Sequence, residues 1–238
     1  MLKLYRTATV PEGHGVTVKR LMPLAGLRNF DPFVLWDHFD IRQGGFPEHP
    51  HCGFEAITYL FDGGMRHTDN LGNKGTIHAG GAQRFTAGSG IVHSEMPDGH
   101  AAGIQLWINL PGHLKDIDPD YQQAEAGDIP EHRDNDVITK TIVGDAGPVV
   151  LHTPVEYLDI VMHAGTTWMR DVPAGFRGLV YLVEGDAEID GMAFRAGEAA
   201  CAEDEESLTI STDSGCRVMW CFGRPHGEPI HQHGPFVD

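Results

Sequence analysis

The stretch GFPEHPHCGFEAITYLFDG, residues 45–63, decides the fold of this 238-residue chain. Its first half places His49 and His51 two positions apart. Its second half is an apolar run that ends in the turn residues Asp62 and Gly63. Residues i and i+2 of an extended strand point to the same face, so both imidazoles are expected to enter one space. The pattern therefore predicts two strands, the first with metal-ligand side chains and the second over residues 55–61.

A second pair with the same spacing, His93 and Glu95, lies in a strand-like stretch at residues 91–96. If the two ligand-bearing strands are neighbours in a small barrel, three imidazoles and one carboxylate converge inside it. Such a ligand set suits Fe(II), Mn, Ni, Cu or Zn better than Ca or Mg, which prefer oxygen ligands. Histidine is common in this chain, 15 of 238 residues, so one H-x-H alone is weak evidence. Two pairs at strand spacing, both flanked by glycines, favour a metal site.

An internal repeat indicates two similar halves. Residues 53–63 align without a gap on residues 175–185, with Gly, Phe, Tyr, Leu and Gly identical. At the positions of the two histidines of the first copy, the second copy has Asp171 and Pro173, so its ligand pair is missing. The repeat therefore predicts two related barrels and one metal ion per chain.

Composition and turn spacing predict an all-β protein. Gly (30) and Pro (15) are plentiful, strand-like stretches alternate with Gly-rich turns, and no long periodic apolar helix stands out. The polar segment 111–136 is interpreted as a linker or a long excursion between the halves. We expect two jelly-roll β-barrels packed together, with few short helices. The N-terminal metal-binding barrel and its linker are placed at residues 1–134, and the C-terminal barrel, without metal ligands, at residues 135–238.

Charge and apolar content argue against several classes of partner. The formal net charge of −17 disfavours direct binding of nucleic acid or anionic membranes, which requires a basic surface. No apolar run approaches the roughly twenty residues of a membrane span, and the first residues lack the apolar core of a secretory signal. The four cysteines form no C-x-x-C pair and are expected to be thiols. We therefore predict a cytoplasmic protein.

Five motifs carry a family resemblance. They are GGFPEHPHCGFEAITYLFDG (44–63), HTDNLGNKGTIHAGG (67–81), FTAGSGIVHSEMP (85–97), GIQLWINLP (103–111) and the closing GEPIHQHGPFV (227–237). Together they resemble the pirin family of the cupin superfamily. The resemblance implies a bicupin with iron, as Fe(II), in its N-terminal barrel. It also implies that His49, His51, His93 and Glu95 are the metal ligands, because each falls on a ligand position of the family.

Glu55 is the competing carboxylate. It lies four residues after His51, which in a continuous strand leaves it on the same face as the histidines. In many cupins the glutamate of this motif is itself a ligand, whereas pirin-like sites resemble the arrangement with Glu95. On that resemblance Glu55 is expected to be a structural carboxylate that could orient a ligand imidazole.

Two departures from the family pattern concern charge near the metal. Cys52 and Ser89 stand where pirins usually carry arginine, so any function of those arginines is in doubt here. Alternation turns Cys52 away from the metal, where a small apolar filler is expected. Phe46, just before the first ligand, is predicted to form a pocket wall. The closing His231 and His233 form another H-x-H without a partner pair, which favours a solvated or packing role.

The resemblance implies two kinds of function. Some pirins have quercetin dioxygenase activity, in which a flavonol ring is cleaved with O2 and CO is released; Glu95 would then be both ligand and general base. Other pirins are regulators that act through a protein partner, a transcription factor or a metabolic enzyme, with the oxidation state of the metal as the switch. A degenerate cupin that binds metal without catalysis is the third reading.

Overall fold

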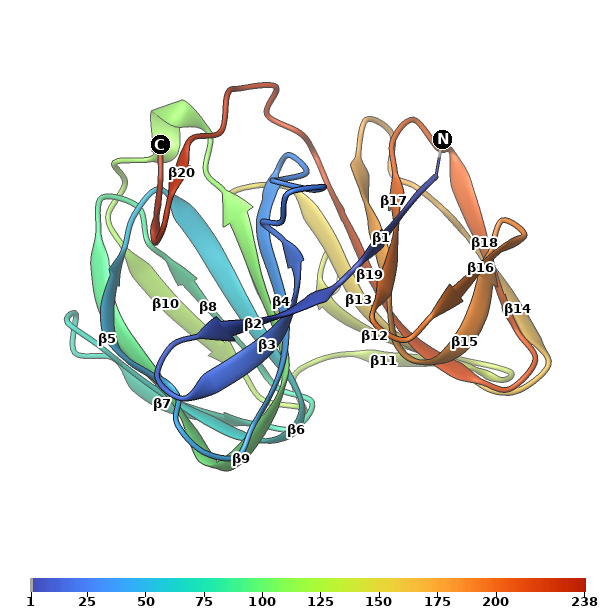
Figure 1. Ribbon diagram of the computed structural model, residues 1–238, viewed down its shortest axis with the longest axis horizontal. Coiled ribbons are helices and arrows are strands. Elements are labelled where there is room, and N and C mark those ends of the chain that lie inside the picture. Colours follow the sequence, from blue (N-terminus) through green and yellow to red (C-terminus); the bar gives the residue numbers. More distant parts are fainter. Residues whose placement is uncertain (1) are drawn as a thin grey trace. The chain divides into compact units, whose positions relative to one another are not determined.

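The computed structural model describes residues 2–238, which are built almost entirely from β-strands (Figure 1). One turn of 3-10 helix, η1 (Gly112–Leu114), is the only helix among these residues. The chain divides into two compact units. The N-terminal unit holds residues 8–129, 151–153 and 226–238, and the C-terminal unit holds residues 2–7, 130–150 and 154–225. The all-β prediction is confirmed, while the single domain boundary after residue 134 stays a prediction.

The N-terminal unit is built from one nine-stranded sheet and a two-stranded hairpin. Its main path runs in the order β10-β8-β6-β9-β4-β3-β2, while β5 pairs with β9, β7 pairs with β6, and β20 pairs with β21 in a separate hairpin. The strands are β2 (Ala8–Glu12), β3 (Val16–Met22), β4 (Phe33–Ile41), β5 (Phe46–His51), β6 (Phe54–Asp69), β7 (Lys74–His78), β8 (Ala82–Thr86), β9 (Ile91–Asn109), β10 (Asp120–Ala124), β20 (Gln232–His233) and β21 (Phe236–Val237).

The two longest strands bend at glycines, and these bends close the sheet. Gly63 in β6 has a φ of +75°, and a Cβ there would lie 2.0 Å from the carbonyl oxygen of His100. Gly99 in β9 has a φ of +80°. Only glycine adopts such angles at low cost. Because β6 and β9 bend side by side, their N- and C-terminal halves face each other across the barrel interior.

The C-terminal unit repeats this design. Gly185, the repeat partner of Gly63, also has a positive φ of +78°, and a Cβ there would lie 2.3 Å from the carbonyl oxygen of Gly215. The sheet order is β1-β17-β15-β19-β13-β12-β11, with β14 paired to β18, and β16 and β18 paired to β15. The strands are β1 (Lys3–Arg6), β11 (Glu131–Asp134), β12 (Val137–Val143), β13 (Val155–Met162), β14 (Thr166–Asp171), β15 (Arg177–Ile189), β16 (Met192–Arg195), β17 (Glu198–Ala202), β18 (Ser207–Thr212) and β19 (Cys216–Gly223).

The segment predicted as a linker or excursion has structure of its own. Residues 111–136 contain η1, β10 and β11, and β10 is an edge strand of the N-terminal sheet, where Tyr121 pairs with Phe85 of β8. The polar sequence of β10 concealed it, because an edge strand with an exposed face needs few apolar side chains. No helix within residues 2–238 has the length and apolar character to cross a membrane.

Candidate metal centre

Three neighbouring strands of the N-terminal unit carry the site. In the register of β5 and β9, His49 lies opposite His93, and on the other side of β9, Asp69 of β6 lies opposite the same histidine. Directly opposite residues of antiparallel strands share a face. His93 therefore has one predicted ligand beside it on one side and a carboxylate on the other.

A bulge in β5 brings Phe46 to the same face. Phe46 lies opposite Glu95 and His49 opposite His93, so three steps along β5 match two along β9. Without this extra residue, positions three apart would point to opposite faces. The bulge explains how Phe46, at an odd spacing from the histidines, lines the cavity beside His49 and His51.

The three predicted histidine ligands meet in one cluster. One ring nitrogen of each of His49, His51 and His93 lies within 4.8 Å of those of the other two, and this is the one such group of metal-ligand side chains found in residues 2–238. The Nε2 atoms of His49 and His93 are 3.1 Å apart. His51 is 3 % exposed and His93 is 0 % exposed. A proton on one of the two facing nitrogens makes this contact a hydrogen bond, and a cation between the rings would be bound by both lone pairs.

Backbone carbonyls orient two of the three rings. Nδ1 of His49 lies 2.7 Å from the carbonyl oxygen of Pro47, and Nδ1 of His51 lies 3.1 Å from that of Pro235. A carbonyl only accepts, so each Nδ1 carries the proton and donates it. The Nε2 atoms of these two rings then keep their lone pairs, as a metal ligand must.

Burial keeps His51 and His93 neutral. Burial, followed by the neighbouring rings of His93 and His49, lowers the pKa of His51 to about 3. Burial, followed by the neighbouring rings of His49 and His67, lowers the pKa of His93 to about 2. Neutral imidazoles bind transition metals without first losing a proton. The donor set present therefore fits a divalent transition metal.

Glu95 is buried in the same interior but has its own hydrogen-bond partners. Oε1 accepts hydrogen bonds from Thr58 Oγ1 (2.9 Å) and Gln83 Nε2 (2.5 Å), and Oε2 accepts one from Gln105 Nε2 (2.6 Å). The three donors lie side by side on β9, β6 and β8. A carboxylate offers about four lone-pair positions, so one remains, on Oε2. Glu95 is not part of the 4.8 Å histidine cluster.

Glu55 points elsewhere, contrary to the expectation that it shares the face of the histidines. Its carboxylate, 0 % exposed, accepts hydrogen bonds from Thr86 Oγ1 (3.0 Å) and from the backbone N–H of His152 (2.9 Å), and its Oε1 lies 3.0 Å from His152 Nδ1. Gly53, with a φ of +82°, ends β5 before β6 begins, so strand alternation does not continue from His51. Among the hydrogen bonds of residues 2–238, Glu55 makes none to the three clustered histidines.

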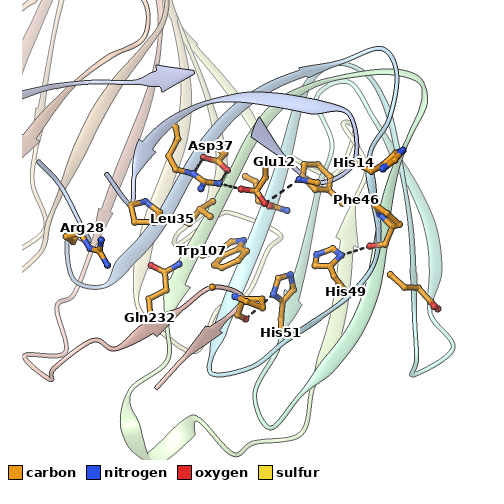
Figure 2. A pocket seen from close by; sticks show the side chains of 18 residues that line it. Glu12, His14, Arg28, Leu35, Asp37, Phe46, His49, His51, Trp107 and Gln232 are labelled. Atoms are coloured by element: carbon orange, nitrogen blue, oxygen red, sulfur yellow. Dashed lines mark hydrogen bonds and ion pairs between the residues drawn. The ribbon is translucent and has the colours of Figure 1, made fainter. Parts of the chain in front are cut away.

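A cavity of about 560 Å³ opens onto the histidines (Figure 2). In Figure 2, His49 and His51 lie at one end and Arg28 at the other, with Trp107 between them. Apolar walls come from Pro23, Leu35, Phe46 and Trp107, and the C-terminal hairpin adds Gln232 and Pro235. The guanidinium of Arg20 is engaged by the carboxylates of Asp37 and Glu12, each at 2.6 Å. The cavity thus joins an aromatic wall to the imidazole cluster.

The other singled-out residues lie outside the histidine cluster. Cys52 is half-buried, and its carbonyl oxygen accepts the N–H of Val237 (3.1 Å), which ties the C-terminal hairpin to the barrel. Ser89 is exposed in a turn. His231 and His233 are exposed on that hairpin and belong to no ligand group found in residues 2–238.

Sequence reasoning missed three polar residues around the site: His67, Asp69 and Gln83. His67 and Asp69 lie opposite Glu95 and His93 in the register of β6 and β9. The one signal for His67 and Asp69 in the sequence is their spacing of two positions in the motif HTDNLGN, the same spacing as in the pairs His49/His51 and His93/Glu95.

Comparisons with known proteins show the family of this chain. The family model for pirin matches residues 15–108, and the model for the pirin C-terminal cupin domain matches residues 157–238. The chain belongs to the pirin family. A pirin-like protein of Caulobacter vibrioides is 38 % identical over 252 residues, which cover 100 % of this chain and 91 % of the relative. The two units are accordingly two cupin domains, as the bicupin prediction required.

Solved structures give the same fold. A quercetin 2,3-dioxygenase from Acinetobacter baumannii superposes with a TM-score of 0.89 at 26 % identity, covering 99 % of this chain and 90 % of that one. A bacterial pirin from Escherichia coli in complex with nickel(II) has a TM-score of 0.78 at 24 % identity, covering 94 % of this chain and 99 % of that one. At that identity the second likeness shows the fold alone.

Proposed function

We propose that this pirin-family protein is a metal-dependent dioxygenase that cleaves the ring of a flavonol such as quercetin with O2. The observation that carries the proposal is the cluster of half-buried His49 and buried His51 and His93 at the end of an aromatic-walled cavity. One divalent transition metal per chain, Fe(II) foremost, would be held by these three imidazoles and by the free lone pair of Glu95. Mn, Ni, Cu and Zn suit the same donors. The named activity of the Acinetobacter baumannii relative supports the substrate class.

When bound, the metal would supply open coordination positions for an oxygen ligand and for O2. The protein's own part is binding and proton transfer. Phe46 and Trp107 would hold the flat ring system against the cavity wall. Glu95 would accept the proton of the flavonol 3-hydroxyl, in the role of general base. Gln105 donates to Glu95 and also lines the cavity, so it lies where it can hold the carboxylate in place during that transfer.

The test is turnover by purified protein loaded with Fe(II) against a panel of flavonols. O2 consumption and CO release should appear together with loss of the flavonol. Glu95→Gln should abolish turnover, because the amide cannot accept the proton. Glu55→Gln is the matched control, since it removes a buried carboxylate that faces His152, and it should retain turnover. Full activity in Glu95→Gln would refute the role of Glu95, and no turnover of any flavonol by the Fe(II)-loaded wild type would refute the dioxygenase.

A regulatory role is the second candidate. The net charge of −17 favours a basic patch on a protein partner over direct contact with nucleic acid. The absence of disulfides among residues 2–238, where all four cysteines are free thiols, supports a reducing compartment such as the cytoplasm. A pull-down at both iron oxidation states separates the candidates. A partner bound in only one state, without flavonol turnover, would favour the regulator.

A further inference from the structure

A buried histidine behind the metal cluster has no role in the function proposed above. His67 of β6 is 1 % exposed and stacks on Tyr121, with ring centroids 4.3 Å apart and an interplanar angle of 19°. Its Nδ1 lies 3.5 Å from Nδ1 of His93, and its Nε2 lies 3.2 Å from Oδ2 of Asp69. The side chains of His67 and Asp69 are both 0 % exposed. Asp69, His67 and His93 thus form a continuous polar chain that leads to the metal cluster.

The carboxylate at the start of this chain is fixed by the turn after β6. Oδ1 of Asp69 accepts the backbone N–H groups of Leu71 and Asn73, both at 2.9 Å. Oδ2 accepts a hydrogen bond from Asn73 Nδ2, also at 2.9 Å. Both oxygens act as acceptors, so the carboxylate is held as an anion that faces His67 with a lone pair.

The proton positions along the chain follow one from another. Because Asp69 only accepts, Nε2 of His67 carries the proton and donates it. A neutral His67 then has a lone pair on Nδ1, and it can only accept from His93. When Nδ1 of His93 carries its proton and donates to His67, the lone pair of His93 is on Nε2. That nitrogen faces Nε2 of His49 at 3.1 Å, so without a metal a proton on Nε2 of His93 can donate to His49 instead. Binding of a metal at Nε2 requires the first arrangement.

We propose that Asp69 and His67 are positioning residues that hold His93 in the tautomer whose Nε2 is free to bind a metal. The inference rests on the proposed metal site and deepens it. Carbonyl oxygens perform this task for His49 and His51. His93 lies near the start of β9, flanked by β5 on one side and β6 on the other, where the adjacent carbonyls belong to the sheet. The side chains of His67 and Asp69 therefore take the place of a carbonyl.

The substitution Asp69→Asn tests this chain without changing its shape. Two backbone N–H groups face Oδ1, so the amide oxygen of the asparagine stays there and its NH2 group takes the place of Oδ2. The side-chain amide of Asn73, which donates to Oδ2 in the wild type, must then turn its oxygen toward this NH2 group. The NH2 also donates to Nε2 of His67, which forces the proton of His67 onto Nδ1. A donor then faces Nδ1 of His93 and confines the proton of His93 to Nε2, the atom that should bind the metal.

Two readouts report on this change. In the metal-free protein, ring ¹⁵N shifts should show His67 protonated on Nε2 in the wild type and on Nδ1 in Asp69→Asn. The affinity for Ni(II), measured by competition with a chelator, should fall about 10- to 100-fold in Asp69→Asn. Asn73→Ala is the matched control, because it loosens the same turn but keeps the carboxylate and the histidine. It should keep the wild-type tautomer and an affinity within about threefold of the wild type.

The inference is overturned if Asp69→Asn leaves both the tautomer of His67 and the Ni(II) affinity unchanged, or if Asn73→Ala loses as much affinity as Asp69→Asn. His67→Phe covers the case in which Asp69→Asn does not fold, because it keeps the ring stacked on Tyr121 and removes the acceptor. It should lower Ni(II) affinity, and unchanged affinity would refute the proposal. The tautomer readout needs neither metal nor flavonol, so failure of the dioxygenase proposal and failure of this one are separate results.

Discussion

Acid should destabilise the metal-free protein through its buried histidines. His51 and His93 have folded-state pKa values of about 3 and about 2, against an unfolded value of 6.5. Below pH 6.5 these two histidines bind protons in the unfolded chain but not in the folded one. The free energy of unfolding therefore falls as the pH falls. Between about pH 8 and about pH 5, each ring contributes a loss of roughly 2 kcal/mol, or roughly 4 kcal/mol for the two. At pH 5 both imidazoles are still neutral in the folded protein, so the size of this loss is set by their pKa of 6.5 in the unfolded chain.

The measurement is urea unfolding in the presence of a chelator, at both pH values. The double variant His51→Gln and His93→Gln should lose roughly 4 kcal/mol less than the wild type over this interval. The exposed pair His231 and His233 offers the matched control, since replacing both with glutamine removes two histidines at the same spacing without touching the cluster. That control should keep the wild-type pH dependence. Equal losses in the wild type and in the buried double variant would refute the reasoning.

Three further predictions concern the barrel and its cavity. Gly53→Ala places a Cβ 1.8 Å from the carbonyl oxygen of Val237, so urea unfolding should show a cost above about 2 kcal/mol and the C-terminal hairpin should become accessible to protease. Phe54→Ala empties a fully buried site and should cost about 3–5 kcal/mol in the same assay. Gln105→Leu removes a donor to Glu95, so Ni(II) affinity should fall about tenfold in a chelator competition; unchanged affinity would contradict the hydrogen-bond set described for that carboxylate.

Much of the fold could be read from local pattern. Strand alternation has a period of two, so a pair such as His49 and His51 carries its shared face in the sequence itself. The repeat was equally informative, because Gly63 and Gly185 are the places where long strands bend with a positive φ, a conformation that only glycine adopts cheaply. The edge strand β10 escaped prediction, since its polar sequence does not show which strand it will join.

The sequence by itself determined which residue pairs share one face of a strand. It also determined that the barrel is duplicated and which histidines could meet in a metal site. Only the tertiary structure decided how the carboxylates are used. Gln105 and Glu95 lie on one strand, ten positions apart, yet their side chains meet because β9 bends back across the barrel. Glu55, much closer in sequence to the first two histidines, is turned away by the glycine between β5 and β6. Alternation is a local property of the backbone, whereas the partners of a buried polar group depend on how distant segments close over it, as Pro235 does over His51.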